Sequence, residues 1–184
     1  MTATKDDGST EGIITGRWLT VDWRGKLRRI RLVVVDTQGH ELEAGAADDL
    51  CRMRDDAARD GIALTINTAF RERSHQERLY GNWLRYNAYR LALDGWREAG
   101  KHGDPPKPVD WAPKAAAPGR STHEIGCAAD IQRAGGDDPK TAKPDSPVDR
   151  WLDEHAHDYG FFRDVPGEAW HYTSVGSVAR IAGA

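Results

Sequence analysis

The apolar residues of the chain fall into short strand-like runs that are separated by helical patterns of unequal length. Residues 62–70 form a β-branched run typical of a buried strand, whereas Leu50, Met53 and Ala57 recur upstream at helical spacing. Strand and helix patterns do not alternate with the regular rhythm of a parallel βαβ fold. We therefore expect an α+β fold with a small, mostly antiparallel sheet flanked by helices.

The N-terminal part of the chain adds one element to this plan. Residues 17–22 and 26–35 are rich in Val, Ile, Leu and Trp, and a turn-forming segment that ends at Gly25 separates them. This pattern predicts an extra N-terminal hairpin. Residues 1–12 are polar and small, so we expect a disordered lead-in followed by a single domain over residues 13–184.

The middle of the chain predicts a long helix and a long loop. Ser74 offers an N-cap for a helix through about Trp96, and the apolar side chains of this helix are interpreted as a stripe that packs on the core. Residues 100–119 contain many Pro and Gly residues, which indicates a long loop of the kind that often lines a binding cleft. The stripe consists of Tyr80, Trp83, Leu84 and Leu91, and the other predicted elements are helices at 42–60 and 148–159 and strands at 126–132 and 169–174.

The composition argues against some classes of partner. The 26 Lys and Arg residues against 29 Asp and Glu residues give a formal net charge of -3, which offers no electrostatic reason to expect nucleic acid or an anionic membrane as a partner. The sequence has no run of about 18 apolar residues, so no membrane insertion is expected. Cys51 and Cys127 lack a CxxC spacing and are interpreted as reduced core thiols.

A histidine and a carboxylate stand close together where one predicted strand begins. Alternate strand residues share a face, so Gly126, Ala128 and Asp130 point the same way. The small residues leave space for a metal ion and a peptide, and His123 can fold back from the preceding loop. The segment therefore predicts an imidazole and a carboxylate at one site.

A second histidine lies beside a glutamate about forty residues further along the chain. Catalytic zinc needs three protein ligands, an open position for water and a base. His123, Asp130 and His171 supply the ligands in this interpretation. Glu168 supplies the base, and Arg71 at the end of a buried strand is the candidate for polarising the substrate carbonyl. Strict strand alternation would separate Glu168 from His171, so we expect the backbone to bend between them.

These residues resemble the motifs of the VanY-type D-alanyl-D-alanine carboxypeptidases. This group of zinc peptidases also includes VanX-type dipeptidases, phage L-alanyl-D-glutamate endolysins and hedgehog-like domains. The resemblance covers about residues 45–176. Its main motifs are Ser121-x-His123-x-x-Gly126-x-Ala128-x-Asp130 and Glu168-x-Trp170-His171, and weaker agreement comes from Thr68 to Arg71 with Gln76, from Trp151-Leu152 and from Tyr159-Gly160-Phe161.

The resemblance implies a hedgehog/D-Ala-D-Ala-peptidase-like domain that binds one Zn2+ ion and acts on peptidoglycan stem peptides, and we expect a monomer. It also implies that Arg71 and Ser121 contact the substrate or the transition state, and that Gln76 and Trp170 lie at substrate-binding positions. Ala169 stands where a Pro is common in the family. The segment between Gln76 and Ser121 is longer than expected for the family, so this insertion is expected to reshape the cleft.

The sequence leaves the cleaved bond open. A D,D-carboxypeptidase must recognise a free terminal carboxylate through a dedicated cation such as Arg73 or Arg120, whereas an endolysin-type endopeptidase needs an open groove. The alternatives are a cytoplasmic D,D-dipeptidase and a non-catalytic zinc module that binds cell-wall peptides. Residues 1–12 lack an apolar signal region, so we expect synthesis in the cytoplasm without a Sec-type signal and action at the bacterial cell wall after release.

Overall fold

The structure, a computed structural model, describes residues 16–133 and 146–183, so the lead-in predicted at 1–12 lies outside the described residues. The strands are β1 (Gly16–Trp23), β2 (Lys26–Val34), β3 (Glu41–Glu43), β4 (Leu64–Thr68), β5 (Ala128–Arg133), β6 (Phe161–Phe162) and β7 (His171–Ser174). The helices are α1 (Ala44–Arg59), α2 (Arg73–Glu98), α3 (Pro147–His155) and α4 (Val175–Gly183), with short 3-10 helices η1 (Thr122–Ile125) and η3 (Ala156–Tyr159).

The central sheet confirms the expected α+β class. Its strand order is β4-β5-β7-β6, and every neighbouring pair is antiparallel. The pairing between β5 and β7 places Asp130 directly opposite His171, and β4 pairs Thr68 with Asp130 on the other side. The buried face of α1, which includes Leu50 and Met53, packs into the same core as these strands. The middle of the sheet is therefore a closely packed platform.

The predicted N-terminal hairpin is confirmed. β1 and β2 pair along their whole length, and Arg24 and Gly25 form the turn with φ angles of 53° and 79°. Two consecutive positive φ angles match the right-handed twist of the flanking strands in a tight hairpin. Ile30 and Leu32 of β2 pack with Cys127 in a second core cluster, so the hairpin covers the segment that leads into β5.

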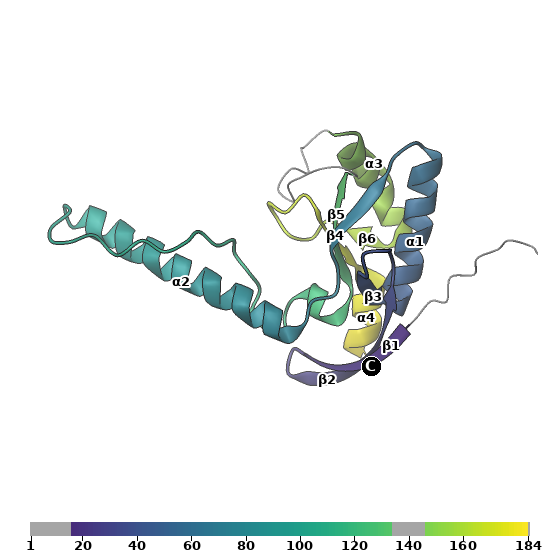
Figure 1. The fold of residues 1–184 in the computed structure, drawn as a ribbon, viewed down its shortest axis with the longest axis horizontal. Coiled ribbons are helices and arrows are strands. Elements are labelled where there is room, and N and C mark those ends of the chain that lie inside the picture. The colour runs from purple at the N-terminus through teal and green to yellow at the C-terminus, as the bar shows by residue number, and fades with distance from the viewer. Residues whose placement is uncertain (1–15, 134–145, 184) are drawn as a thin grey trace, which may run out of the picture.

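One part of the molecule leaves this body as an arm, which we define as α2 together with the returning limb of residues 99–119 (Figure 1). The hairpin turn contacts both ends of the arm. The backbone N–H of Arg24 donates to the carbonyl of Gly119 at 2.9 Å, and Nη2 of Arg73 donates to the carbonyl of Asp22 at 3.0 Å. The arm therefore begins and ends at one place on the body.

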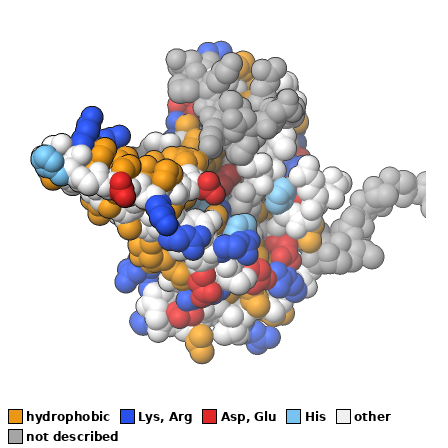
Figure 2. All heavy atoms as spheres, turned by 60° about the vertical axis from the view of Figure 1, so that its left-hand side comes forward, with side chains coloured by type: hydrophobic (Ala, Val, Ile, Leu, Met, Phe, Trp, Pro, Cys, Tyr) orange, Lys and Arg blue, Asp and Glu red, His pale blue; other side chains and the backbone are white. Residues whose placement is uncertain are grey.

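The apolar stripe of α2 does not pack on the core, so that prediction was wrong. Gln76 is the one buried residue among the 26 residues of this helix, all of which the structure describes. Leu84 and Leu91 are 44% and 66% exposed, and Tyr80 and Trp83 are only half-buried. The reason is that the helix leaves the body after its first turns and runs beside its own returning limb, where apolar side chains gather on the surface (Figures 1 and 2).

Smaller differences from the predictions follow from local geometry. Cys127 is buried as expected, but Cys51 is exposed because it lies one position past Leu50, about 100° around α1 from the buried face. The helix predicted at 148–159 ends as an α-helix at His155 and continues as η3. Within the described parts of the chain, no helix combines the length and the apolar character needed to cross a membrane.

Candidate metal centre

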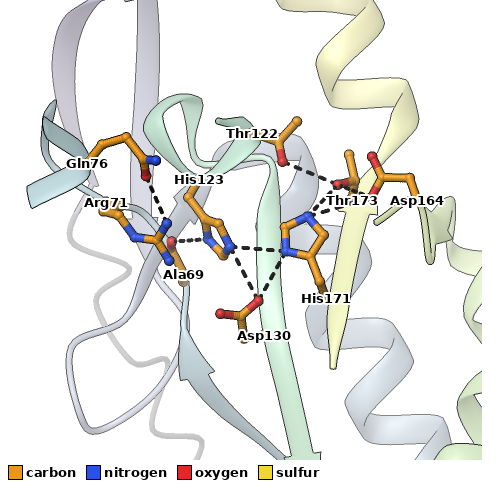
Figure 3. Close-up of polar contacts among 9 residues, drawn as sticks. All are labelled: Ala69, Arg71, Gln76, Thr122, His123, Asp130, Asp164, His171 and Thr173. Carbon is orange, nitrogen blue, oxygen red and sulfur yellow. Dashed lines mark hydrogen bonds and ion pairs between the residues drawn. The ribbon is translucent and has the colours of Figure 1, made fainter. Parts of the chain in front are cut away.

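Three side chains from separate elements converge at the centre of the sheet (Figure 3). His123 comes from η1, Asp130 from β5 and His171 from the first position of β7. His123 Nε2 lies 3.2 Å from His171 Nδ1 and 3.3 Å from Asp130 Oδ1, and His171 Nδ1 lies 3.1 Å from the same oxygen. All three side chains are buried. The fold thus brings the two sequence motifs together at one point.

Gly126 allows the chain to turn from η1 into β5 and so to carry His123 back over the strand. Its φ of 67° is in the left-handed region. A Cβ at this position would lie 2.7 Å from the backbone nitrogen of Glu43 and 2.8 Å from a methyl carbon of Leu32. Both distances are shorter than real Cβ contacts, so the turn requires glycine for space as well as for conformation.

The hydrogen bonds of His123 fix which of its ring nitrogens carries the proton. Nδ1 lies 2.7 Å from the carbonyl oxygen of Ala69, which can only accept, so Nδ1 carries the hydrogen. Burial lowers the pKa of His123 and keeps the ring neutral. Its Nε2 therefore presents a lone pair toward Asp130 and His171.

The outer nitrogen of His171 is held in a similar way. The hydroxyl of Thr173 donates to Asp164 Oδ1 at 2.9 Å, and His171 Nε2 lies 3.2 Å from that hydroxyl oxygen. Because the Thr173 proton is already used, Nε2 must donate to the hydroxyl, and Nδ1 is left with a lone pair. Thr122 Oγ1 lies 3.3 Å from the same hydroxyl and completes its surroundings (Figure 3).

Three lone pairs that face one another in a buried site call for a cation. Burial acts to raise the pKa of Asp130, but the neighbouring His123 and His171 lower it by more, so the carboxylate is ionised. Ligand atoms about 2.0–2.1 Å from a tetrahedral zinc ion lie about 3.3 Å apart. The observed spacings of 3.1 to 3.3 Å fit this geometry. The donor set therefore suits a zinc ion with its fourth position open.

Arg71 lies beside this centre and is held from behind. Its Nη1 donates to Gln76 Oε1 at 2.9 Å, and Gln76 Nε2 donates to the carbonyl of Ala116 at 2.7 Å. Burial lowers the pKa of Arg71, and the carboxylates of Asp130 and Glu168 oppose this effect. The buried Nε of Arg71 has no hydrogen-bond partner among the described residues. The guanidinium is thus only partly engaged by the protein.

Glu168 lies in the turn before β7, so the bend that the sequence required is present. The strand begins at His171, whose backbone N–H donates to the carbonyl of Glu168 at 3.0 Å, and Gly167 has a φ of 85°. Burial raises the pKa of Glu168 above its ordinary value. His171 and Arg71 lower this pKa and Asp130 raises it, which places Glu168 within electrostatic range of two of the three cluster residues and of Arg71.

The remaining predicted site residues are positioned mainly by backbone contacts. Glu124 is buried, and its carboxylate accepts the backbone N–H groups of Gly119 at 2.8 Å and Ser121 at 3.3 Å. This fixes the entry to η1 and places Ser121 two residues before His123. The carbonyl of Trp170 accepts from the backbone N–H of Ile131 at 2.8 Å, and its side chain is half-buried.

Sequence reasoning missed three residues that shape the centre. The spacing of Glu124 behind Ser121 matches a capping box, which is a signal that could have found it. No comparable signal points to Asp164 or Thr173. Their role depends on contacts across β7 that a single sequence does not display.

Comparison with known proteins identifies relatives of this chain. A family described as VanY: D-alanyl-D-alanine carboxypeptidase matches residues 39–177. A D-alanyl-D-alanine carboxypeptidase of Enterococcus faecalis (strain ATCC 700802 / V583) is 37% identical over 71 residues, which are 33% of this chain and 25% of that protein. The aligned part thus spans about a quarter of the length of that relative.

Solved structures share the fold. A Zn(II) complex of the vancomycin resistance D,D-pentapeptidase VanY from a VanB-type resistance cassette has a TM-score of 0.53 and 24% identity, and the alignment covers 78% of each chain. VanYB in complex with D-alanine-D-alanine gives a TM-score of 0.54 and 24% identity over 78% of this chain and 77% of that one. The D,D-dipeptidase VanXYg has a TM-score of 0.52 and 17% identity, and the alignment covers 94% of this chain and 74% of that one. Because the family match covers most of the sequence, the resemblance seen in the motifs is confirmed, and the chain belongs to the VanY family of D-alanyl-D-alanine carboxypeptidases.

Proposed function

We propose that this protein is a zinc-dependent D,D-carboxypeptidase that removes the terminal D-alanine from peptidoglycan stem peptides. The observation that carries the proposal is the convergence of three buried lone pairs, from His123, Asp130 and His171, beside a glutamate of raised pKa and a partly engaged arginine. Membership of the VanY family supports the choice of substrate.

The residues around the centre divide the chemistry between them. A zinc ion held by the three ligands would supply Lewis acidity, which polarises the scissile carbonyl and makes water acidic enough to react near neutral pH. Glu168 takes a proton from the attacking water and passes it to the amide nitrogen that leaves with D-alanine. Its raised pKa suits both halves of this transfer. Arg71 stabilises the negative charge that develops on the carbonyl oxygen.

The terminal carboxylate of the substrate needs a cation of its own. Of the two arginines suggested by the sequence, Arg73 is engaged by the protein itself: its Nε lies 3.4 Å from the buried carboxylate of Glu124, and Nη2 donates to the carbonyl of Asp22. This engagement favours Arg120 as the carboxylate-binding residue.

A digest of muropeptides tests the proposal directly. The purified protein with zinc is incubated with muropeptides that end in D-alanyl-D-alanine, and the masses of the products are measured by mass spectrometry. We expect the loss of one D-alanine. A cut at L-alanyl-D-glutamate or at a crosslink would show an endopeptidase instead, and tight binding without turnover at full zinc occupancy would show a non-catalytic binding module.

The role of Glu168 is tested by removing its carboxylate. Glu168→Ala is expected to lower kcat by about 100-fold or more while zinc still binds. Glu154→Ala, on the exposed side of α3, is the matched control and should retain full activity. Full activity of Glu168→Ala would rule out the proposed base.

A further inference from the structure

The arm carries a hollow that the chemistry of the metal centre does not use. It has a volume of about 360 Å³ and is lined by Asn82 and Arg85 of α2 and by residues 108–112 of the returning limb. This size lies within the range of small-ligand sites. Asp110 and Trp111 belong to its lining, and Trp111 is 57% exposed. The hollow thus offers an accessible indole beside an amide, a guanidinium and a carboxylate.

This set of groups matches the surface of a sugar ring. The C–H face of a pyranose is apolar and packs on a flat indole, while its hydroxyl and acetamido groups need hydrogen-bond donors and acceptors at the ring edge. Nη2 of Arg85 donates to Oδ1 of Asn82 at 2.5 Å, and the amide NH2 of Asn82 and the further N–H groups of Arg85 supply donors while Asp110 supplies acceptors.

The walls of the hollow are linked to the candidate active site through Gln76 and Ala116. The returning limb that forms one wall passes Ala116, whose carbonyl is bonded to Gln76, and Gln76 in turn holds Arg71. Asn82 and Arg85 follow Gln76 by six and nine residues along α2. A helix rises 1.5 Å per residue, so they lie about 9 and 14 Å from Gln76 along the helix axis.

The length of the substrate agrees with this separation. In a stem peptide that ends in D-alanyl-D-alanine, about three residues separate the sugar from the residue that supplies the scissile carbonyl. Three extended residues span about 10 Å. The reach of such a stem is therefore comparable to the distance from Gln76, which holds Arg71, to the hollow along α2.

The charge of the arm points to the same occupant. Residues 73–119 contain eight Lys and Arg against five Asp and Glu, although the whole chain has 26 against 29. The arm is therefore the cationic part of an otherwise acidic protein. Cell-wall stems carry free carboxylates, so a cationic arm favours approach of the polymer over approach of a neutral ligand.

We propose that the hollow between α2 and residues 108–112 is a glycan subsite, which holds a sugar residue of the strand while the attached stem is cleaved at the metal centre. This proposal rests on the proposed function for the identity of the polymer, but sugar binding itself does not require hydrolysis. The subsite makes the glycan-linked stem a better substrate than the free peptide.

A kinetic comparison of two substrates tests the subsite. Wild-type protein is expected to show a lower KM for a disaccharide-linked pentapeptide than for the free pentapeptide. Trp111→Ala should raise the KM for the linked substrate about tenfold and leave kcat and the free-peptide KM unchanged, and Trp111→Phe should retain most of the preference. Leu91→Ala, a similarly exposed residue of the arm outside the hollow, is the control and should change neither KM. Equal KM values for the two substrates in the wild type, or equal losses in Trp111→Ala, would overturn the proposal.

A binding measurement separates failure of the subsite from failure of the proposed function. Glycan chains stripped of their stems are titrated calorimetrically into the zinc-loaded full chain. We expect binding that Trp111→Ala and Asn82→Ala both weaken. Binding without any hydrolysis of stems would keep the subsite and reject the peptidase, whereas hydrolysis without glycan binding would reject the subsite alone. Self-association that Trp111→Ala abolishes, with no glycan bound, would assign the hollow to a second copy of this chain and overturn the proposal.

Discussion

The central sheet and the arm are built on opposite principles. In β5, Ala128, Ala129 and Ile131 are at most 1% exposed, so each position is fixed by neighbours on several sides. In α2, Gln76 is the single buried residue of the 26. Close packing can hold three ligand atoms to within a few tenths of an ångström, whereas a helix supported mainly by its own hydrogen bonds and one limb cannot. The sheet is therefore suited to chemistry and the arm to recognition.

The largest expected difference between the two regions is in how much a substitution lowers the free energy of unfolding. Leu50→Ala, in the core under the sheet, is expected to lower the free energy of unfolding by about 2–5 kcal/mol, because it leaves a cavity. Leu91→Ala, on the arm, should change it by less than about 0.5 kcal/mol. Urea unfolding measures both values. Similar losses in the two variants would mean that the arm packs as tightly as the body.

The metal affinity should depend on the body alone. Thr173→Val removes the hydroxyl that accepts from His171 Nε2, so zinc affinity is expected to fall about 10- to 100-fold in a chelator competition. Thr173→Ser keeps the hydroxyl and should stay near the wild-type value. Leu91→Ala should leave the affinity unchanged. An affinity loss in the arm variant would break the division between the two regions.

Gln76 joins the two regions, and its variants can separate its two contacts. Gln76→Ala frees Arg71 and is expected to lower kcat about tenfold with unchanged zinc affinity, because a hydrogen bond to a charged group is lost. Gln76→Glu can still accept from Arg71 but cannot donate to the carbonyl of Ala116. Its kcat should therefore lie closer to the wild-type value than its KM does. Equal kcat values in Gln76→Ala and the wild type would mean that Arg71 needs no support from the arm.

The smallest expected effect is on the pH dependence of kcat/KM, which should be set by residues of the body and not by the arm. Burial raises the pKa of Glu168, so its basic form is lost at a higher pH than for an ordinary glutamate as the pH falls. The acidic limb of the kcat/KM profile at saturating zinc is therefore expected above the ordinary value of 4.5. Leu91→Ala should show the same limb. A limb at or below 4.5 would argue against Glu168 as the base.

The body could be predicted from the sequence because its signals are local. Alternation of side chains places Asp130 on one face of a short strand, and the tight turn at Gly25 defines the hairpin. The histidine motifs belong to a family whose pattern is specific. These features depend on residues that are neighbours in the sequence or on a pattern that can be recognised directly.

The arm and the support of His171 could not be predicted in the same way. A helical stripe such as Leu84 and Leu91 shows which side of a helix is apolar, but it does not show what covers that side. The contacts of Thr173 with Thr122 and of Thr173 with Asp164 join residues that are far apart or on different elements. Such contacts depend on the tertiary arrangement and leave no periodic pattern.

The hairpin turn has a consequence for how this protein can change over evolution. It holds Arg73 at the start of the arm and Gly119 at its end within hydrogen-bond reach of one turn. An insertion whose two ends meet at a fixed anchor can be lengthened, shortened or exchanged without moving the strands that flank it. The arm is therefore a replaceable module, which can change in length and sequence while the geometry of His123, Asp130 and His171 stays the same.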